Sequence, residues 1–257
     1  MTIEYTKQGN VGIITINRPG ARNAVNSEVA TGIEDAIDQI EADDEVWVGI
    51  LTGAKTDKGY IFCAGADLKQ MSVDPGGMQT ERGGFGGFVA RERTKPIIAA
   101  VDGPALAGGT ELVLAADLVV ASKTAVFGIP EVKRGLVAGG GGLLRLPQRI
   151  PYAIAMELAL TGENLSAERA HELGLVSALT DAGGALDGAI ALAVKIGANG
   201  PLAVAATKKI VVESRYWGDE EQWTEQMKIL APVFMSKDAQ EGAVAFAEKR
   251  APKWTGT

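Results

Sequence analysis

Two adjacent glycines at the start of a predicted helix are the first place where this chain could do chemistry. Residues 104–117 read Pro-Ala-Leu-Ala-Gly-Gly-Thr-Glu-Leu-Val-Leu-Ala-Ala-Asp and follow an apolar run, 96–101, that predicts a buried strand. The first N–H groups of a helix have no intrahelical partner, and glycine lets another group approach them closely. Glu111 lies beside them in the first turn. The pattern predicts a site that stabilises developing negative charge, or else an ordinary helix start with a favourable acidic residue.

A second turn of small residues has the same character. Residues 63–67, Cys-Ala-Gly-Ala-Asp, follow a short apolar strand, as residues 107–111 do. Two backbone N–H donors aimed at one oxygen form an oxyanion hole, and each donor contributes about 2.7–4 kcal/mol in the transition state. The sequence does not show that the two turns meet. Each turn taken alone is also typical of an ordinary strand-to-helix connection.

Glu111 and Glu131 are the two carboxylates set among these turns. Two glutamates that flank a reacting centre can divide the roles of general acid and general base. The alternative for Glu131 is a solvated loop residue after a proline, and for Glu111 it is compensation of the helix dipole. Arg22, Lys69 and Lys249 could bind phosphate, or they could be ordinary surface charges.

Other kinds of catalytic site are excluded by counting residues. One histidine and one cysteine cannot build a zinc site of the usual ligand types, so we expect no metal. His171 stands among charged residues and is predicted to lie on the surface, while Cys63 is predicted to pack in the core rather than act as a nucleophile. The chain has no Gly-x-Ser-x-Gly elbow, no Gly-Lys pair of a P-loop and no complete Gly-x-Gly-x-x-Gly fingerprint.

The composition bounds the class of protein. The chain has 257 residues, 46% hydrophobic and 22% charged, which suits one globular domain with a substantial core. Its net charge of -7 argues against partners such as nucleic acid or acidic membranes. No secretory signal is recognisable, and no apolar stretch reaches membrane-spanning length. We therefore expect a soluble, cytoplasmic protein without membrane association.

Strands and helices alternate in the first half of the chain, and helices dominate the second half. Strands are predicted at 3–5 and 11–17, joined by a turn at Gly9-Asn10, and a helix capped by Ser27 is predicted at 27–42. Residues 46–52 form an almost continuous apolar strand that predicts burial on both faces. Shorter strands are predicted at 118–121 and 125–128, and helices at 152–160, 166–173, 185–198, 202–215, 219–235 and 238–249. This order favours an α/β domain with a helical C-terminal part, divided near residues 197–201.

Residues 71–88 are unusually rich in glycine and contain Phe85 and Phe88. Glycine at this density predicts little stable secondary structure, while the two aromatic rings need a surface to cover. We interpret the segment as a mobile flap over an apolar ligand; a disordered loop is the alternative.

Taken together, these motifs resemble the crotonase superfamily, and specifically its enoyl-CoA hydratase group. The resemblance spans nearly the whole chain, in motifs that follow the family's order. They are Asn-Arg-Pro-Gly-Ala-Arg-Asn-Ala at 17–24 (adenine-binding loop), Phe-Cys-Ala-Gly-Ala-Asp-Leu-Lys at 62–69 (first oxyanion motif), Gly-Pro-Ala-Leu-Ala-Gly-Gly-Thr-Glu-Leu at 103–112 (second oxyanion motif), Phe-Gly-Ile-Pro-Glu-Val at 127–132 with the glycine-rich run at 139–147, and Ala-Phe-Ala-Glu-Lys-Arg at 245–250 (C-terminal helix).

The resemblance implies a spiral of β-β-α turns over residues 1–198 and a helical trimerisation region over residues 199–257. Members of this family form homotrimers that often pair as hexamers. It also implies an acyl-CoA thioester as the substrate and no separate cofactor, because coenzyme A is part of the substrate.

The resemblance also assigns roles to individual residues. The N–H groups of Ala66 and Gly108 would hold the thioester oxygen, while Glu111 would deprotonate the attacking water and Glu131 would protonate C2. The reaction would be hydration of a 2-enoyl-CoA to a 3-hydroxyacyl-CoA, of the fatty-acid β-oxidation type. Contacts with substrate and CoA are implied for Arg22, Ala24, Ala64, Asp67, Leu68, Lys69, Gly139, Phe246 and Lys249, the last reaching the CoA of its own or a neighbouring subunit.

The sequence departs from the hydratase pattern at two positions and leaves the acyl group open. Ala107 stands where many hydratases have glycine, and Ala138 where many have proline. Residues 131–147 are also similar to carnitinyl-CoA dehydratases, which keep both glutamates. The substrate could therefore be a fatty enoyl-CoA or a carnitinyl-type or branched acyl-CoA, and a non-catalytic CoA-binding protein of the same fold is the third hypothesis.

Overall fold

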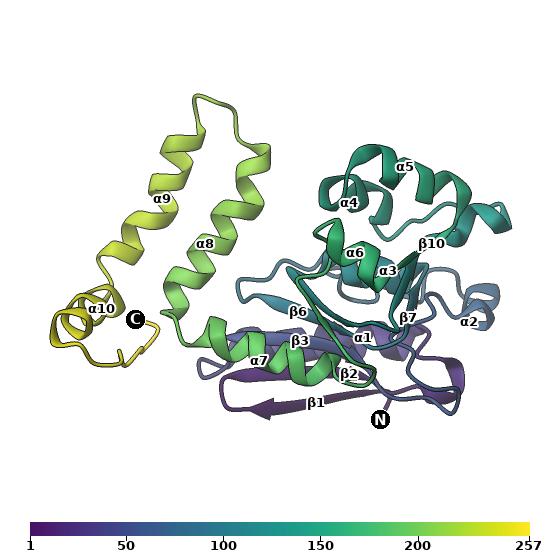
Figure 1. Ribbon diagram of the computed structural model, residues 1–257, viewed down its shortest axis with the longest axis horizontal. Helices are drawn as coiled ribbons and strands as arrows, with labels where there is room; N and C mark the ends of the chain where they lie inside the picture. The colour runs from purple at the N-terminus through teal and green to yellow at the C-terminus, as the bar shows by residue number, and fades with distance from the viewer.

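Six strands form the main sheet, in the order β1-β2-β3-β6-β8-β11 (Figure 1). The computed structural model describes all residues, 1–257. β1 and β2 form the predicted antiparallel hairpin, and every other pair in this sheet is parallel. The strands span Ile3–Gln8 (β1), Val11–Ile16 (β2), Val48–Gly53 (β3), Ile97–Val101 (β6), Leu118–Ser122 (β8) and Ala178–Thr180 (β11). The three-residue β11 was not predicted.

Helices cover both faces of the main sheet, as the apolar run of β3 predicts. Leu51 packs in the cluster that contains Ile33 and Ile37 of α1 (Ser27–Ala42), whereas Ile50 packs against α7 (Ala185–Gly197). Alternating side chains of a strand point to opposite faces, which explains this division. The predicted bounds of α1 are confirmed, but its cap is Asn26, whose side chain accepts a hydrogen bond from Val29 N–H.

A smaller sheet stands beside the main one and carries the turns of interest. Its strands are β7 (Pro104–Leu106), β9 (Val126–Gly128) and β10 (Asn164–Ser166), in the order β10-β9-β7. The chain passes from β6 to β7 and then into α3 (Gly108–Ala115), and from β8 to β9 and then into the 3₁₀ helix η2 (Pro130–Arg134). Each unit thus gives one strand to each sheet before a helix, which is the β-β-α turn that the family resemblance implies.

The glycine-rich segment contains little regular secondary structure, as predicted, but it packs closely against α1. The last turn of α2 (Leu68–Val73) lies at its start, and a hairpin of the two-residue strands β4 (Gln79–Thr80) and β5 (Gly84–Phe85) follows. Phe88 is fully buried in the core, and Arg82 forms an ion pair with Asp38 of α1. A Cβ on Gly87 would lie 2.0 Å from the carbonyl oxygen of Ala30, so this glycine permits close packing on α1. The many glycines of this segment allow its backbone to approach α1 closely. Composition alone cannot reveal such a contact.

Three helices form an arm that projects from the body (Figure 1). They are α8 (Pro201–Glu213), α9 (Gln222–Phe234) and α10 (Lys237–Glu248), while α4 (Gly142–Arg149), α5 (Tyr152–Thr161) and α6 (Ala167–Glu172) belong to the body. The C-terminal tail returns to the base of the arm, where the Trp254 indole donates to the carbonyl of Ala198. No single helix is long and apolar enough to cross a membrane; α7 and the segment Pro201–Tyr216 meet the length and composition criteria only together, with a bend of 106° between them.

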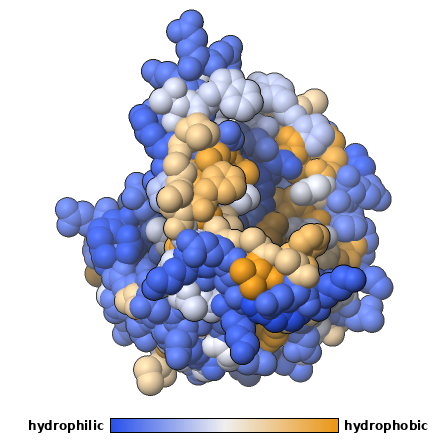
Figure 2. Space-filling view, turned by 90° about the vertical axis from the view of Figure 1, so that its left-hand side faces the viewer, coloured by the Kyte–Doolittle hydropathy of each residue, from blue (hydrophilic) through white to orange (hydrophobic).

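The arm leaves many large apolar side chains exposed. Seen from the end of the molecule that carries the arm, apolar surface flanks a hollow (Figure 2). The exposed apolar residues of the arm include Val211, Tyr216, Trp223, Met227, Phe234, Met235, Val244 and Phe246. A surface of this kind is typical of a protein interface.

Candidate active site

The two small-residue turns lie against each other. Cys63 and Ala105 form a parallel β-bridge, and Leu106 N–H donates to the carbonyl of Cys63 over 3.0 Å. A Cβ on Gly65 would lie 3.0 Å from the backbone nitrogen of Gly108. The structure therefore brings together the two turns whose convergence the sequence could not show.

Each turn presents one backbone N–H that donates to no group of the protein. Val25 pairs with both neighbours of Ala66, because its N–H donates to Gly65 and its carbonyl accepts from Asp67, and this leaves Ala66 N–H outside the ladder. Gly108 is the first residue of α3, so its N–H has no intrahelical partner. Two adjacent free donors are what an oxyanion hole requires.

Ala107 holds a strained backbone conformation directly before the second donor. Its φ of 51° and ψ of -126° belong to a region that glycine adopts more readily, and its N–H donates to the carbonyl of Gly128. Such a conformation in a residue with a Cβ costs on the order of 1–3 kcal/mol. The hydrogen bond to Gly128 helps to maintain this conformation. The conformation of Ala107 in turn sets the direction in which Gly108 N–H points.

Replacing Ala107 with glycine is expected to stabilise the protein by about 1 kcal/mol. Relief of on the order of 1–3 kcal/mol of strain exceeds the roughly 0.5–1 kcal/mol that a glycine costs in chain entropy. Denaturant unfolding at a fixed protein concentration measures the difference. Ala64→Gly is the control, because Ala64 has no positive φ and its replacement should destabilise instead. A loss of stability in Ala107→Gly equal to that of the control would contradict the assignment of strain.

Glu111 is buried and held by the glycine-rich run that follows η2. Its side chain is 3% exposed, and its Oε1 accepts a hydrogen bond of 2.9 Å from Gly142 N–H at the start of α4. Burial raises the pKa of the Glu111 carboxyl, while hydrogen bonds from the N–H groups of Gly142 and Gly140 oppose that rise. The carboxyl is thus fixed in place while the raised pKa brings it closer to the range useful for proton transfer.

Gly140 and Gly142 are the members of the run that touch Glu111. A Cβ on Gly140 would lie 2.6 Å from Oε2 of Glu111, and one on Gly142 would lie 3.0 Å from its Cγ. A Cβ on Gly139, the residue chosen from the sequence, would meet nothing within 4 Å. Sequence reasoning missed Gly140 and Gly142, and the run of four glycines was the only signal for them.

Glu131 lies in η2, half-buried, with one carboxyl oxygen that has no partner. Its Oε2 is buried and makes no hydrogen bond. Burial raises the pKa of the Glu131 carboxyl, its own backbone N–H opposes the rise, and the charge of Glu111 adds to it. The alternative interpretation of Glu131 as a plain solvated loop residue does not describe this carboxyl. A carboxyl with a raised pKa and one unpartnered oxygen is better suited to donating a proton than an exposed glutamate is.

Phe85 is the aromatic side chain of the hairpin that reaches the site. A Cβ on Gly108 would lie 2.4 Å from Cζ of Phe85, so the ring packs directly on this glycine. Phe88 instead lies in the core, with the guanidinium of Arg93 4.2 Å from its ring centre. Of the two phenylalanines that the sequence placed over a ligand, only Phe85 is positioned to touch one.

The predicted CoA-binding loops are tied to the small-residue turn at residues 63–67. Ala64 N–H donates to the carbonyl of Arg22, and both Arg22 and Lys69 are exposed. Asp67 forms an ion pair of 3.0 Å with Arg18 and caps α2 by accepting from Lys69 N–H. Its carboxylate is therefore occupied in positioning the turn. Of the neighbouring predicted contacts, Ala24 is buried and Leu68 exposed.

Asn23 organises the same loop and was not singled out from the sequence. Its side chain is fully buried, donates to the carbonyls of Ala54 and Ile61, and accepts from Arg18 N–H. Its backbone is left-handed, with φ of 56°, which asparagine tolerates better than most residues. The preference of asparagine for this conformation was the feature of the sequence that could have pointed to Asn23.

Phe246 and Lys249 are not brought to the other predicted residues within one chain. Phe246 lies in the last turn of α10 and Lys249 directly follows that helix, at the opposite end of the molecule from α2 (Figure 1). Phe246 is 87% exposed. Within this chain the site is therefore composed of elements of the body, without the arm.

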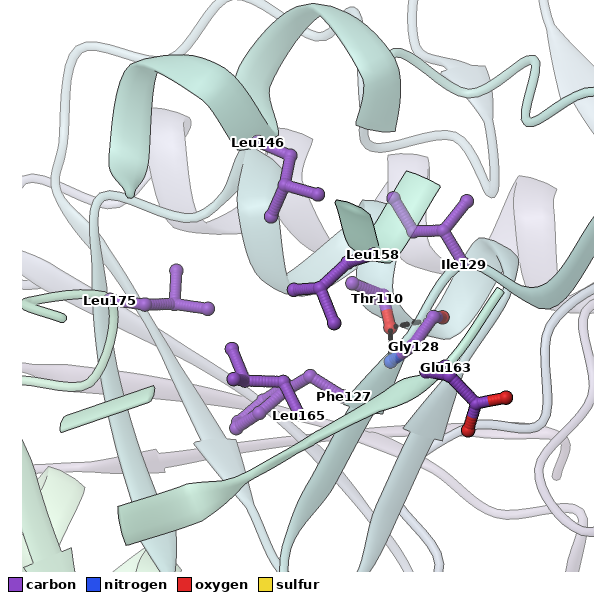
Figure 3. A pocket seen from close by; sticks show the side chains of 9 residues that line it. All are labelled: Thr110, Phe127, Gly128, Ile129, Leu146, Leu158, Glu163, Leu165 and Leu175. Atoms are coloured by element: carbon purple, nitrogen blue, oxygen red, sulfur yellow. Dashed lines mark hydrogen bonds between the residues drawn. The ribbon is translucent and has the colours of Figure 1, made fainter. Parts of the chain in front are cut away.

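A small cavity lies behind the site, between α5 and the smaller sheet. Leu146, Leu158, Leu165 and Leu175 gather around it, and the hydrogen bonds of Thr110 lie at its edge (Figure 3). Its volume is about 10 Å³. A space of that size has room for about one water molecule, so an acyl chain does not fit there.

Cys63 and His171 take no part in the site. Cys63 is fully buried, and burial raises the pKa of its thiol to about 12, which confirms the prediction of core packing. His171 is exposed, as predicted, and its Nδ1 is hydrogen-bonded to the carbonyl of Val176.

The fold and the site together define a class of protein: an α/β chain that presents two free backbone N–H groups near two buried carboxyls, suited to acid–base chemistry at a carbonyl compound. A profile of the family described as enoyl-CoA hydratase/isomerase matches residues 6–257. The chain therefore belongs to the enoyl-CoA hydratase/isomerase family of enzymes. This confirms the family resemblance and the α/β fold that the sequence motifs implied.

Similar proteins are known from several mycobacteria. The crystal structure of an enoyl-CoA hydratase from Mycobacterium tuberculosis is 62% identical and superposes with a TM-score of 0.95, covering 100% of this chain and 99% of that one. Enoyl-CoA hydratase EchA19 of the same species is 42% identical over 96% of this chain and 94% of its own. A carnitinyl-CoA dehydratase from Mycobacterium avium is 43% identical, with a TM-score of 0.76 and coverage of 100% and 99%.

Proposed function

We propose that this protein is an enoyl-CoA hydratase, which adds water to a 2-enoyl-CoA to give a 3-hydroxyacyl-CoA. The observation that carries the proposal is the pair of glutamates, buried Glu111 and half-buried Glu131, beside the free N–H groups of Ala66 and Gly108. Hydratases are named among the relatives, including the one with the same shape at 62% identity.

The proposed mechanism follows from where charge develops. When the oxygen of water bonds to C3 of the conjugated thioester, negative charge gathers on the carbonyl oxygen, where Ala66 and Gly108 donate hydrogen bonds. Glu111 takes a proton from the water, and Glu131 gives a proton to C2, so the double bond is lost and the elements of water are added. Proton transfer suffices for every step, so the reaction needs no cofactor other than the CoA of the substrate.

We place the nucleotide end of CoA near Arg22 and Lys69. Both are exposed cations on loops joined to the first oxyanion turn, and CoA carries phosphates that such cations attract. Lys249 and Phe246 would reach the CoA held by a neighbouring copy, because the arm carries them away from the site of their own chain.

We further propose that residues 199–257 form a trimerisation region beside a spiral core of residues 1–198, and that trimers or pairs of trimers are the working form. The exposed apolar side chains of the arm and the break between α7 and α8 support this division. Light scattering of the purified protein distinguishes a monomer of 26.7 kDa from a trimer or hexamer. A monomer at micromolar concentration would contradict the proposal.

A carnitinyl-CoA dehydratase is the second candidate. The similarity of residues 131–147 and a relative of that name at 43% identity favour it. That relative superposes with a TM-score of 0.76, against 0.95 for the hydratase of 62% identity, which favours hydration of an enoyl-CoA. A non-catalytic CoA-binding role is the third candidate.

A substrate panel tests these proposals. The protein is incubated with crotonyl-CoA, longer 2-enoyl-CoAs and crotonobetainyl-CoA, and loss of the conjugated-enoyl absorbance is followed. We expect hydration of crotonyl-CoA or a longer homologue. A preference of tenfold or more for crotonobetainyl-CoA would support the dehydratase instead, and no turnover of any member would overturn the catalytic proposal.

A further inference from the structure

Thr110 connects the turn that carries Glu111 to the strand that leads to Glu131. It lies between Gly108 and Glu111 in the first turn of α3 and is 2% exposed. Its Oγ1 lies 2.9 Å from the nitrogen of Gly128, the last residue of β9. Figure 3 shows these contacts between Thr110 and Gly128, which come from different β-β-α units.

The hydroxyl of Thr110 uses both its donor and its acceptor. It accepts from Gly128 N–H, and it donates to one of two carbonyls, that of Ala105 at 2.6 Å or that of Gly128 at 2.8 Å. Gly128 is itself buried. Without the hydroxyl, the N–H of Gly128 would lose this hydrogen bond, and the loss of a hydrogen bond between buried groups weakens the attachment of β9 to α3.

The position of β9 matters because the Glu131 carboxyl is held by its own backbone N–H, and no hydrogen bond from another residue fixes it. Glu111 is fixed by Gly142 N–H, whereas Oε2 of Glu131 is buried without a partner. The location of that carboxyl therefore depends on the path of the backbone. Glu131 follows Gly128, the last residue of β9, by only three residues. The N–H of Ala107 also donates to the carbonyl of Gly128. The end of β9 is therefore joined to the start of α3 by this bond and by the hydroxyl of Thr110.

We propose that Thr110 is a positioning residue that sets the spacing between the two glutamates by anchoring the end of β9 to the first turn of α3. This inference rests on the proposed hydratase function. Thr110 does not touch the reacting atoms; it acts through Gly128 on Glu131 and through its own helical turn on Gly108 and Glu111.

The test compares Thr110→Val with Thr110→Ser on the full-length enzyme. Valine keeps the shape and removes the hydroxyl, so we expect kcat to fall at least tenfold while KM for the enoyl-CoA stays within threefold. Serine keeps the hydroxyl and should retain kcat within threefold. Thr52→Val is the matched control, because Thr52 is also buried and its hydroxyl donates to the carbonyl of Ala100, away from both glutamates. It should lose stability without losing kcat.

Amide hydrogen exchange at Gly128 gives a readout that does not depend on activity. We expect faster exchange in Thr110→Val and wild-type protection in Thr110→Ser. If the valine variant does not fold, Thr110→Cys, whose thiol is a weaker acceptor, should give intermediate exchange and intermediate kcat. Equal kcat in the Thr110→Val and Thr52→Val variants would overturn the inference while leaving the hydratase proposal intact. If the wild type hydrates no enoyl-CoA, the hydratase proposal fails, and the Gly128 exchange alone decides whether the hydroxyl anchors β9.

Discussion

Glutamine in place of either glutamate is expected to lower kcat by about 10²–10⁴-fold, the usual contribution of a positioned acid or base. Glu111→Gln keeps an oxygen that can accept from Gly142 N–H but cannot take a proton from water. Glu131→Gln cannot deliver a proton to C2. Steady-state hydration of the best enoyl-CoA of the panel measures both losses, and KM should change far less than kcat because neither residue is expected to bind CoA.

The same variants separate catalysis from folding. A variant that lost activity by unfolding would also lose its melting transition, whereas Glu131→Gln is expected to melt no lower than the wild type. Its Oε2 has no partner to lose, and glutamine keeps an oxygen that can accept from the backbone N–H of residue 131, so the change removes the titratable carboxyl without removing a hydrogen bond. Unchanged turnover in both variants would remove the acid–base roles and leave the non-catalytic hypothesis.

Glu131→Gln should also change how stability depends on pH. Burial and the charge of Glu111 raise the pKa of Glu131 above its ordinary value, although Arg134 opposes this. Between the ordinary pKa and the raised pKa the folded protein binds more protons than the unfolded chain, so the wild type loses stability as pH rises through that interval. Glutamine removes this loss. We therefore expect the stability of the variant relative to the wild type to be greater at pH 8 than at pH 4, just below the ordinary pKa of 4.5, as measured by denaturant unfolding.

The main parts of the site could be predicted from sequence because each has a local signal. A strand followed by glycines and Glu111 predicts free N–H groups and a carboxyl in one turn, and the apolar run of residues 46–52 predicts a strand buried on both sides. Their meeting could not be predicted from physics alone. It depends on the bridge between Cys63 and Ala105, which lie far apart in the sequence, and on strands such as β7 and β10 that are too short for a recognisable period.

The close contacts of the glycines could not be predicted from the sequence, since glycine has no side chain that indicates a contact. At residues 71–88 the glycines allow a hairpin to pack on α1, a contact that composition does not reveal. In the run 139–142 the sequence could not tell which glycine touches Glu111. Local rules are broken at Ala107, which has a positive φ, and at Glu131, which has a buried unpaired oxygen. Both lie at the site, where strain and unsatisfied groups are expected to serve function.

Gly140→Ala tests this reading of the glycine run, and we expect it to lower kcat by about 10²-fold or more, the scale of loss when a catalytic group is misplaced. The added Cβ would lie 2.6 Å from Oε2 and 2.9 Å from Cδ of Glu111, so the carboxyl must move. The φ of Gly140 is not positive, so alanine introduces this contact without backbone strain of the left-handed kind.

Gly139→Ala is the matched control, because the neighbouring glycine also has no positive φ and its Cβ would meet nothing within 4 Å. The control should keep kcat within threefold of the wild type, and both variants should fold. If Gly139→Ala proved the more damaging of the two, the water pocket would depend on Gly139, as the family resemblance implied. If Gly140→Ala is the more damaging, as we expect, the run contains glycine because Gly140 approaches Glu111 closely. A carboxyl that must take a proton from one water molecule tolerates little displacement.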